Sequence, residues 1–158
     1  MTRPGFRFSR TFTLDGLPAT EAFGATIADG LERGDLVFLE GDLGAGKTTL
    51  ARAILKRLGV GEDVPSPTFT LVQHYDSGRL MVRHYDLYRI EDPREIDELG
   101  IEEALDEGAA LVEWPERAAA RLPDDTLHVV LTMTDENARI AQVSGIARWE
   151  KLMAGTHV

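Results

Sequence analysis

The residues best suited to chemistry in this sequence form a glycine-rich segment that begins at Gly41. The segment runs directly into a lysine and a threonine, and it matches the pattern G-x-x-x-x-G-K-[ST] of a phosphate-binding P-loop. Glycines let the backbone turn tightly, so that successive N–H groups can surround phosphate oxygens. Lys47 can reach the β- and γ-phosphates, and the Thr48 hydroxyl can bind Mg²⁺. The pattern therefore predicts that a nucleoside triphosphate is bound by Gly41, Asp42, Leu43, Gly44, Ala45, Gly46, Lys47, Thr48 and Thr49.

A P-loop also needs an acidic side chain to complete its magnesium site, usually at the end of a neighbouring apolar strand. Glu113 follows the apolar run 109–112, and Asp86 follows the less apolar run 80–85. Because parallel strands of one sheet end at a common edge, we expect both acids beside the P-loop. The composition does not assign their roles. The quality of the two strands favours Glu113 as the Mg²⁺ ligand and Asp86 as the residue that orients the attacking water.

The segments around these residues predict the elements that position them. Apolar runs at 36–40 and 109–112 are typical of buried parallel strands, and Asp92 with Pro93 resembles the start of a helix. Periodicity predicts further helices at 20–31, from the P-loop to 58, at 101–105 and at 145–153, and strands at 6–12, 69–75, 80–85, 126–133 and 139–143. The run 126–133 alternates as an edge strand does. These elements predict one α/β domain over 1–158, a three-layer P-loop NTPase fold with a mostly parallel central sheet, antiparallel edge strands and flanking helices.

The composition restricts where such a protein works and what it contacts directly. The chain of 158 residues carries a formal net charge of -10 and has no cysteine. This charge disfavours strong direct binding to nucleic acid, because nucleic-acid binders usually present a basic face. No segment is long and apolar enough for a membrane span or a signal peptide, so a cytoplasmic protein is expected.

Four residues or segments near the predicted site have more than one interpretation. Ser66-Pro67-Thr68 lies where many NTPases sense the γ-phosphate, and it fits a rigid loop corner equally well. Trp114 is expected in the core by default, although its position beside Glu113 also allows contact with a base or a partner. His74 and His84 are more typical of packed or surface histidines than of ligands.

Four blocks of the sequence resemble the TsaE family, the small bacterial ATPases of tRNA threonylcarbamoyladenosine synthesis. They occur in the family's order and spacing and span about half of the chain. The blocks are Gly41-Asp42-Leu43-Gly44-Ala45-Gly46-Lys47-Thr48-Thr49, Ser66-Pro67-Thr68-Phe69-Thr70-Leu71-Val72, His84-Tyr85-Asp86-Leu87-Tyr88-Arg89 and Leu111-Val112-Glu113-Trp114-Pro115-Glu116.

This resemblance implies an ATPase that uses ATP and Mg²⁺ and is activated by the TsaB–TsaD complex, which it would reset between cycles of tRNA modification at position 37. The tRNA would be contacted only indirectly, through that complex. The implied catalytic residues are Lys47 and Asp86, and the implied Mg²⁺ ligands are Thr48 and Glu113. Further nucleotide contacts implied outside the loop are Trp114, Thr20 and Arg139, the last two with adenine.

Three other functions remain open at the level of the sequence. A small-molecule kinase would need arginines on a flexible lid, whereas Arg83, Arg89 and Arg94 are scattered over predicted strand and helix. A GTPase switch is suggested by the D-x-x-G match at 97–100, but the end of a helix explains this match more simply, and no N-K-x-D motif occurs. The third alternative is a scaffold that binds a nucleotide without hydrolysing it.

Overall fold

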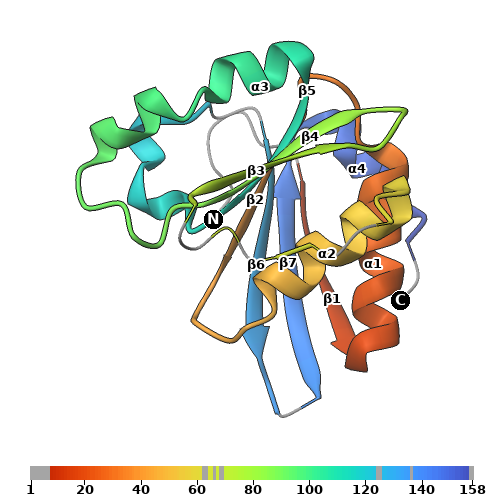
Figure 1. Ribbon diagram of the computed structural model, residues 1–158. Helices are drawn as coiled ribbons and strands as arrows, with labels where there is room; N and C mark the ends of the chain where they lie inside the picture. The colour runs from red at the N-terminus through yellow and green to blue at the C-terminus, as the bar shows by residue number, and fades with distance from the viewer. Residues whose placement is uncertain are drawn as a thin grey trace.

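The computed structural model describes residues 8–61, 64–65, 67, 70–123, 126–135 and 137–156. In these ranges, seven strands form one sheet, and helices cover it (Figure 1). The elements are β1 (Phe8–Asp15), α1 (Gly16–Gly30), β2 (Leu36–Gly41), α2 (Lys47–Leu58), β3 (Val72–Asp76), β4 (Met81–Asp86), η1 (Pro93–Glu98), α3 (Ile101–Glu107), β5 (Gly108–Glu113), η2 (Pro115–Arg117), η3 (Ala119–Arg121), β6 (Leu127–Met133), β7 (Ala138–Gly145) and α4 (Ala147–Ala154), where η marks a 3₁₀ helix.

The strands follow the order β1-β7-β6-β2-β5-β4-β3 across the sheet. The four central strands, β6, β2, β5 and β4, are parallel to one another, whereas β7 runs antiparallel to both of its neighbours and β3 runs antiparallel to β4. The predicted fold class, a P-loop NTPase fold with a mostly parallel sheet, is therefore confirmed. β2 and β5 are parallel strands inside the sheet, and because such strands are buried on both faces, their sequences are continuous apolar runs.

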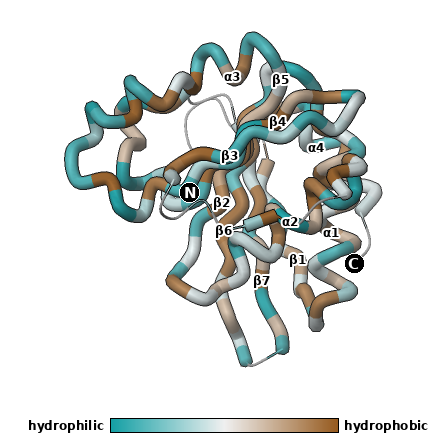
Figure 2. The backbone as a smooth tube through the Cα atoms, viewed as in Figure 1, coloured by the Kyte–Doolittle hydropathy of each residue, from teal (hydrophilic) through white to brown (hydrophobic). Residues whose placement is uncertain are grey.

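Two hydrophobic cores lie on opposite faces of the sheet. The larger core joins the sheet to α1, α2 and α4 through residues such as Phe23, Leu50 and Trp149. The smaller core joins β2, β4 and β5 to α3 and η1 through residues such as Phe38, Tyr85 and Ile101. Apolar residues accordingly concentrate along the central strands, and polar ones along loops and outward helical turns (Figure 2). The three-layer arrangement is thus complete over the parallel half of the sheet.

Some predicted elements differ from the observed ones. The segment 126–133 was expected at an edge, but β6 lies inside the sheet between β2 and β7. Leu127, Val129 and Leu131 pack against the larger core, whereas the residues between them are the polar His128, which is buried against Phe38, and the more exposed Val130 and Thr132. The strand expected from residue 69 begins only at Val72, since Leu71 has a left-handed backbone with φ 68°. Asp92 does cap its helix, by accepting a hydrogen bond from the Arg94 N–H, although that helix is 3₁₀.

None of the helices in the described ranges combines the length and the apolar composition that crossing a membrane requires. Because β2, β5 and β4 are parallel neighbours, their carboxyl ends lie together at one edge of the sheet. This edge carries the residues whose chemistry the sequence singled out.

Candidate nucleotide and metal site

The P-loop connects β2 to α2 and holds the start of the helix against the sheet edge. Gly41 ends β2 with φ 143°, and a Cβ at this position would lie 2.5 Å from the Leu131 carbonyl oxygen on β6. Only glycine fits both this conformation and this close approach. Gly46 precedes the helix in a left-handed conformation, and no side chain among the described residues caps the helix start. The N–H groups of the first turn are therefore free for an anion.

Lys47 is buried, and its ammonium lies inside the curve of the loop. Its Nζ donates hydrogen bonds to the carbonyl oxygens of Gly41 at 2.6 Å and Asp42 at 2.9 Å. Burial lowers the pKa of the Lys47 ammonium, while the carboxylates of Glu113, Glu116 and Asp86 act against that shift. The lysine thus lies among acids and loop carbonyls, where a phosphate group would be its natural counter-ion.

Thr48 and Glu113 meet directly in front of the first turn of α2. The Thr48 hydroxyl lies 2.8 Å from Oε1 and 3.0 Å from Oε2 of Glu113. Glu113 ends β5 and is only 2% exposed. On its far side, Oε2 lies 2.6 Å from Nε2 of His84, which belongs to β4 and is completely buried. The carboxylate is therefore held between a hydroxyl and an imidazole.

Asp86 ends β4 directly beside Glu113, since the two residues are partners in the parallel register of β4 and β5. Its Oδ1 accepts a hydrogen bond of 3.0 Å from the Tyr88 N–H, and the residue is 4% exposed. Both acids share the edge with the P-loop, as the sequence predicted. The loop and both acids line a cavity of about 310 Å³, whose walls are Leu43, Gly44, Gly46, Lys47, Thr48, Thr49, Asp86, Glu113, Trp114 and Arg139.

Trp114 lies at the margin of the smaller core and packs against it, whereas the default expectation was a position inside the core. It is only half-buried, and its ring lies 4.1 Å from the Lys47 ammonium and 4.9 Å from the Tyr88 ring. The reason is its backbone: φ 58° and ψ 47° turn the chain away from the sheet immediately after Glu113. The indole therefore forms one wall of the cavity beside the P-loop.

Thr20 and Arg139 come together on the other side of the P-loop, although they lie far apart in the sequence. They line a second cavity, of about 150 Å³, together with Gly16, Leu17, Ala45, Gly46, Thr49, Leu131 and Asn137. The Arg139 guanidinium donates a hydrogen bond of 2.9 Å to the Ala45 carbonyl oxygen in the loop. Arg139 also lines the larger cavity, so it stands between the two.

The side chains beside Thr48 fit a magnesium ion in their chemistry. Mg²⁺ prefers hard oxygen ligands and usually retains several waters, with one or two carboxylates and phosphate oxygens completing its shell. The Thr48 hydroxyl and the Glu113 carboxylate supply such oxygens from two different elements. In the part of the chain that the structure describes, no group of three or more His, Cys, Asp or Glu side chains is arranged to hold a metal. An ion here would be shared with the nucleotide.

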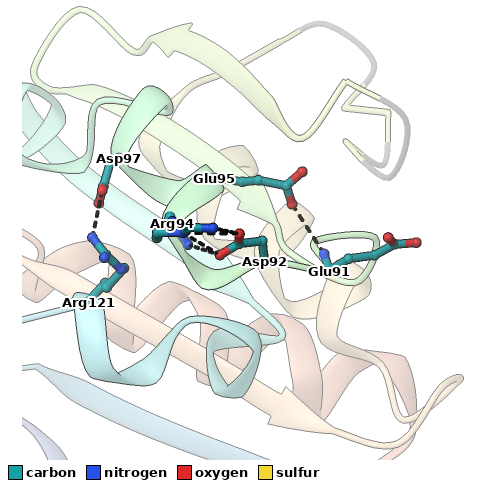
Figure 3. A network of polar contacts seen from close by, with 6 residues as sticks. All are labelled: Glu91, Asp92, Arg94, Glu95, Asp97 and Arg121. Carbon is teal, nitrogen blue, oxygen red and sulfur yellow. Dashed lines mark hydrogen bonds and ion pairs between the residues drawn. The ribbon is translucent and has the colours of Figure 1, made fainter.

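Residues that suggested other functions are engaged away from this site. Arg94 pairs with Asp92, and Asp97 of the D-x-x-G match pairs with Arg121 at 2.6 Å (Figure 3). Arg83 contacts the Gly100 carbonyl oxygen and carboxylates of α3. The helix η1 ends at Glu98, which supports the helix-end interpretation of that match. Of Ser66-Pro67-Thr68, Ser66 and Thr68 lie outside the described residues, so the interpretation of this segment stays a prediction.

His84 is the residue of the site that the sequence interpretation missed. It was expected to be a packed histidine, and it is one, but it packs against the carboxylate beside Thr48. A signal was present, because His84 lies near the end of the strand predicted at 80–85, two positions before Asp86, and residues two apart along a strand face the same side of the sheet. His74, in contrast, is exposed on β3.

The fold and the loop define the class of this protein as the P-loop NTPase fold of the α/β proteins. Within that class, residues 14–141 match the family model described as "Threonylcarbamoyl adenosine biosynthesis protein TsaE". The chain belongs to the TsaE family.

Similar proteins agree with this assignment in sequence and in structure. The tRNA threonylcarbamoyladenosine biosynthesis protein TsaE of Rickettsia prowazekii is 41% identical over 132 residues, which cover 83% of this chain and 92% of the relative. The protein of the same name from Bacillus subtilis is 37% identical over 135 residues, 84% of each chain. A crystal structure of Bacillus subtilis YdiB superimposes with a TM-score of 0.79 at 29% identity, covering 94% of this chain and 93% of that one.

Proposed function

We propose that this protein binds ATP with Mg²⁺ at the P-loop and hydrolyses it in the service of tRNA threonylcarbamoyladenosine synthesis. One observation carries the proposal: the Thr48 hydroxyl and the Glu113 carboxylate meet in front of the first turn of α2, beside the buried Lys47. A hydroxyl and a strand-end acid in this relation are the protein's share of a P-loop magnesium site. When bound, Mg²⁺ would neutralise charge on the β- and γ-phosphates.

Each residue around the cavity has a separate proposed role in ATP binding or hydrolysis. Lys47 exchanges its loop carbonyls for phosphate oxygens, and the first-turn N–H groups of α2 bind the remaining charge. Thr48 and Glu113 serve as metal ligands. Asp86 is next to Glu113 but has its oxygen on the Tyr88 N–H rather than on Thr48, which supports a different role. It orients the attacking water as the catalytic carboxylate.

The cavity on the other side of the loop would accept the base. Thr20 and Arg139 both line it, and we propose them as contacts with adenine, while Trp114 forms the wall on the metal side. A third cavity residue, Asn137, carries an amide that can both donate and accept hydrogen bonds. Sequence reasoning did not select it.

The role in tRNA modification follows from the relatives. Their names place them in tRNA threonylcarbamoyladenosine biosynthesis, and we extend this role to the present chain. With a formal net charge of -10, the protein is poorly suited to hold tRNA itself. We propose that a TsaB–TsaD complex holds the tRNA, and that ATP turnover in the cytoplasm resets this complex between cycles.

The proposal is tested by multiple-turnover tRNA modification in a reconstituted system of TsaB, TsaD and this protein. We expect repeated modification with ATP and Mg²⁺, and no more than one round when a non-hydrolysable ATP analogue replaces ATP. The Asp86→Asn variant, which keeps the size of the side chain, is expected to behave like the analogue. Repeated modification by the Asp86→Asn protein at the wild-type rate would overturn both the role of Asp86 and the reset mechanism.

A further inference from the structure

We propose that His84 is a positioning residue for the magnesium site, which holds the Glu113 carboxylate in the orientation that the metal requires. The inference rests on the proposed function, because it concerns the same Mg²⁺. It assigns a role to a buried side chain that neither the P-loop nor the strand-end acids explain.

The sheet places the two side chains together. His84 on β4 is paired with Leu111 on β5, and Glu113 lies two positions further along β5 on the same face. Diagonal neighbours of this kind are within reach of long side chains. Both residues are almost inaccessible to water, His84 at 0% and Glu113 at 2% exposure. Water therefore cannot replace either side chain as the hydrogen-bond partner of the other.

The hydrogen bonding of the imidazole assigns its tautomer. Nε2 lies 2.6 Å from Glu113 Oε2, whereas Nδ1 is buried without a hydrogen-bond partner among the described residues. A carboxylate only accepts, so Nε2 carries the proton and donates it. A proton on Nδ1 would be a buried donor without an acceptor, which is costly. His84 therefore donates to Glu113 through Nε2.

This arrangement fixes the direction in which the Glu113 carboxylate faces. Oε2 is fixed by His84, and both carboxylate oxygens face the Thr48 hydroxyl within hydrogen-bond distance. Groups that hydrogen-bond a ligating carboxylate fix its orientation and commonly affect metal affinity. Nδ1 is buried without a hydrogen-bond partner among the described residues. The hydrogen bond from Nε2 to Glu113 is therefore the polar contact that the buried ring contributes.

The test measures how much Mg²⁺ is needed for ATP binding, by calorimetry on the full-length protein over a range of metal concentrations. His84→Phe keeps a ring but removes the donor, so the half-saturating Mg²⁺ concentration is expected to rise by about tenfold or more. ATP binding without metal is expected to stay close to wild type. His84→Gln, whose amide can donate near the same point, is expected to restore much of the metal affinity.

A second buried histidine provides the matched control. His128 on β6 is 3% exposed, and its Nδ1 lies 3.2 Å from a carboxylate oxygen of Glu40. His128 packs against Phe38 of the smaller core, whereas Glu113 shares its face of β5 with Leu111 of the larger core, so the two pairs lie on opposite faces of the sheet. His128→Phe therefore removes the same kind of buried pair and is expected to leave the Mg²⁺ dependence unchanged. Equal Mg²⁺ dependence in wild type and His84→Phe overturns the inference, and so does an equal rise in His128→Phe. A wild-type protein that binds no ATP at any Mg²⁺ concentration would instead overturn the proposed function.

A measurement on the unaltered protein decides the question if His84→Phe does not fold. Proton and nitrogen NMR of the imidazoles should show a slowly exchanging Nε2 proton on His84, and this proton should persist when ATP and Mg²⁺ are added. A His84 ring protonated on Nδ1 alone, or loss of the Nε2 proton on loading, would contradict the proposed role.

Discussion

The two sides of the P-loop are built in different ways. On the metal side, the polar groups of Glu113, Asp86 and His84 are buried, and the register of two parallel strands fixes their positions. On the base side, Thr20 is buried on α1, whereas Arg139 lies near the start of β7, where its side chain is half-exposed. A fully buried side chain in the sheet is held in one position, whereas the half-exposed Arg139 side chain can change its conformation. We therefore expect the metal side to determine turnover and the base side to tune affinity.

Asp86 provides the largest expected effect on the metal side. Asp86→Asn keeps an oxygen for the Tyr88 N–H but loses the negative charge that can orient or accept a proton from water. We expect turnover to fall by about 10²–10⁴-fold, the usual share of a general base. ATP affinity should stay within a few-fold, since an interaction made only in the transition state does not affect binding. Steady-state kinetics with the partner complex, and calorimetry for ATP, measure the two quantities separately.

The contrary outcome for Asp86 is informative. If Asp86→Asn weakened the binding of Mg²⁺ and ATP while leaving turnover at saturation unchanged, Asp86 would be the metal ligand. The roles of Asp86 and Glu113 would then be exchanged.

Lys47 belongs to the loop itself and is expected to have the next largest effect. Lys47→Ala removes a charge-assisted phosphate contact worth about 1.5–3 kcal/mol. This corresponds to a loss of ATP affinity of about ten- to hundredfold. The variant also loses two bonds to the loop carbonyls, so its thermal unfolding must be measured beside wild type. Unchanged ATP affinity in a folded Lys47→Ala protein would remove the basis for a phosphate site at this loop.

The difference between the two sides also explains what the sequence could predict. The strand-end acids Glu113 and Asp86 were found because parallel strands bring their ends to one edge, a rule that needs no coordinates. The contact of Thr48 with Glu113 rather than Asp86 depends on side-chain geometry, and strand quality only favoured it. His84 escaped because a period of two gives its face but not the neighbour that it meets on β5.

The errors in the fold have a similar origin. β6 alternates because Leu127, Val129 and Leu131 face the larger core while polar or more exposed residues lie between them, and that pattern does not distinguish an edge strand from an inner strand. Trp114 was expected in the core because large aromatic residues usually bury, but its left-handed backbone turns it into the cavity. Local patterns predict elements and their faces, and they do not predict such turns in the chain.

Removal of the metal is expected to have a smaller effect, which tests the role of Glu113 on the metal side. Without Mg²⁺, the negative charges of Asp86, Glu113 and Glu116 would repel the phosphates, and the positive charge of Lys47 would offset this repulsion only in part. Chelation of Mg²⁺ should therefore weaken ATP binding in wild type, on the order of tenfold. Glu113→Gln has one negative charge less and one metal ligand less, so chelation should matter less in this variant. Calorimetry with and without a chelator measures both proteins, and equal losses would contradict a role for Glu113 in the metal site.

Arg139 gives the smallest expected effect and tests where the boundary between the two sides lies. It lines both cavities, and its guanidinium donates a hydrogen bond to the Ala45 carbonyl oxygen. Because it is half-exposed and bonded to backbone oxygens of the loop and of β7, we place it on the base side. Arg139→Ala should then cost about one hydrogen bond of ATP affinity, roughly fivefold, with turnover at saturating ATP and the Mg²⁺ dependence both unchanged. A fall in saturated turnover comparable to that of Asp86→Asn would show that the guanidinium acts on the phosphates. The metal side would then extend across the loop, and the base side would be reduced to Thr20 and Asn137.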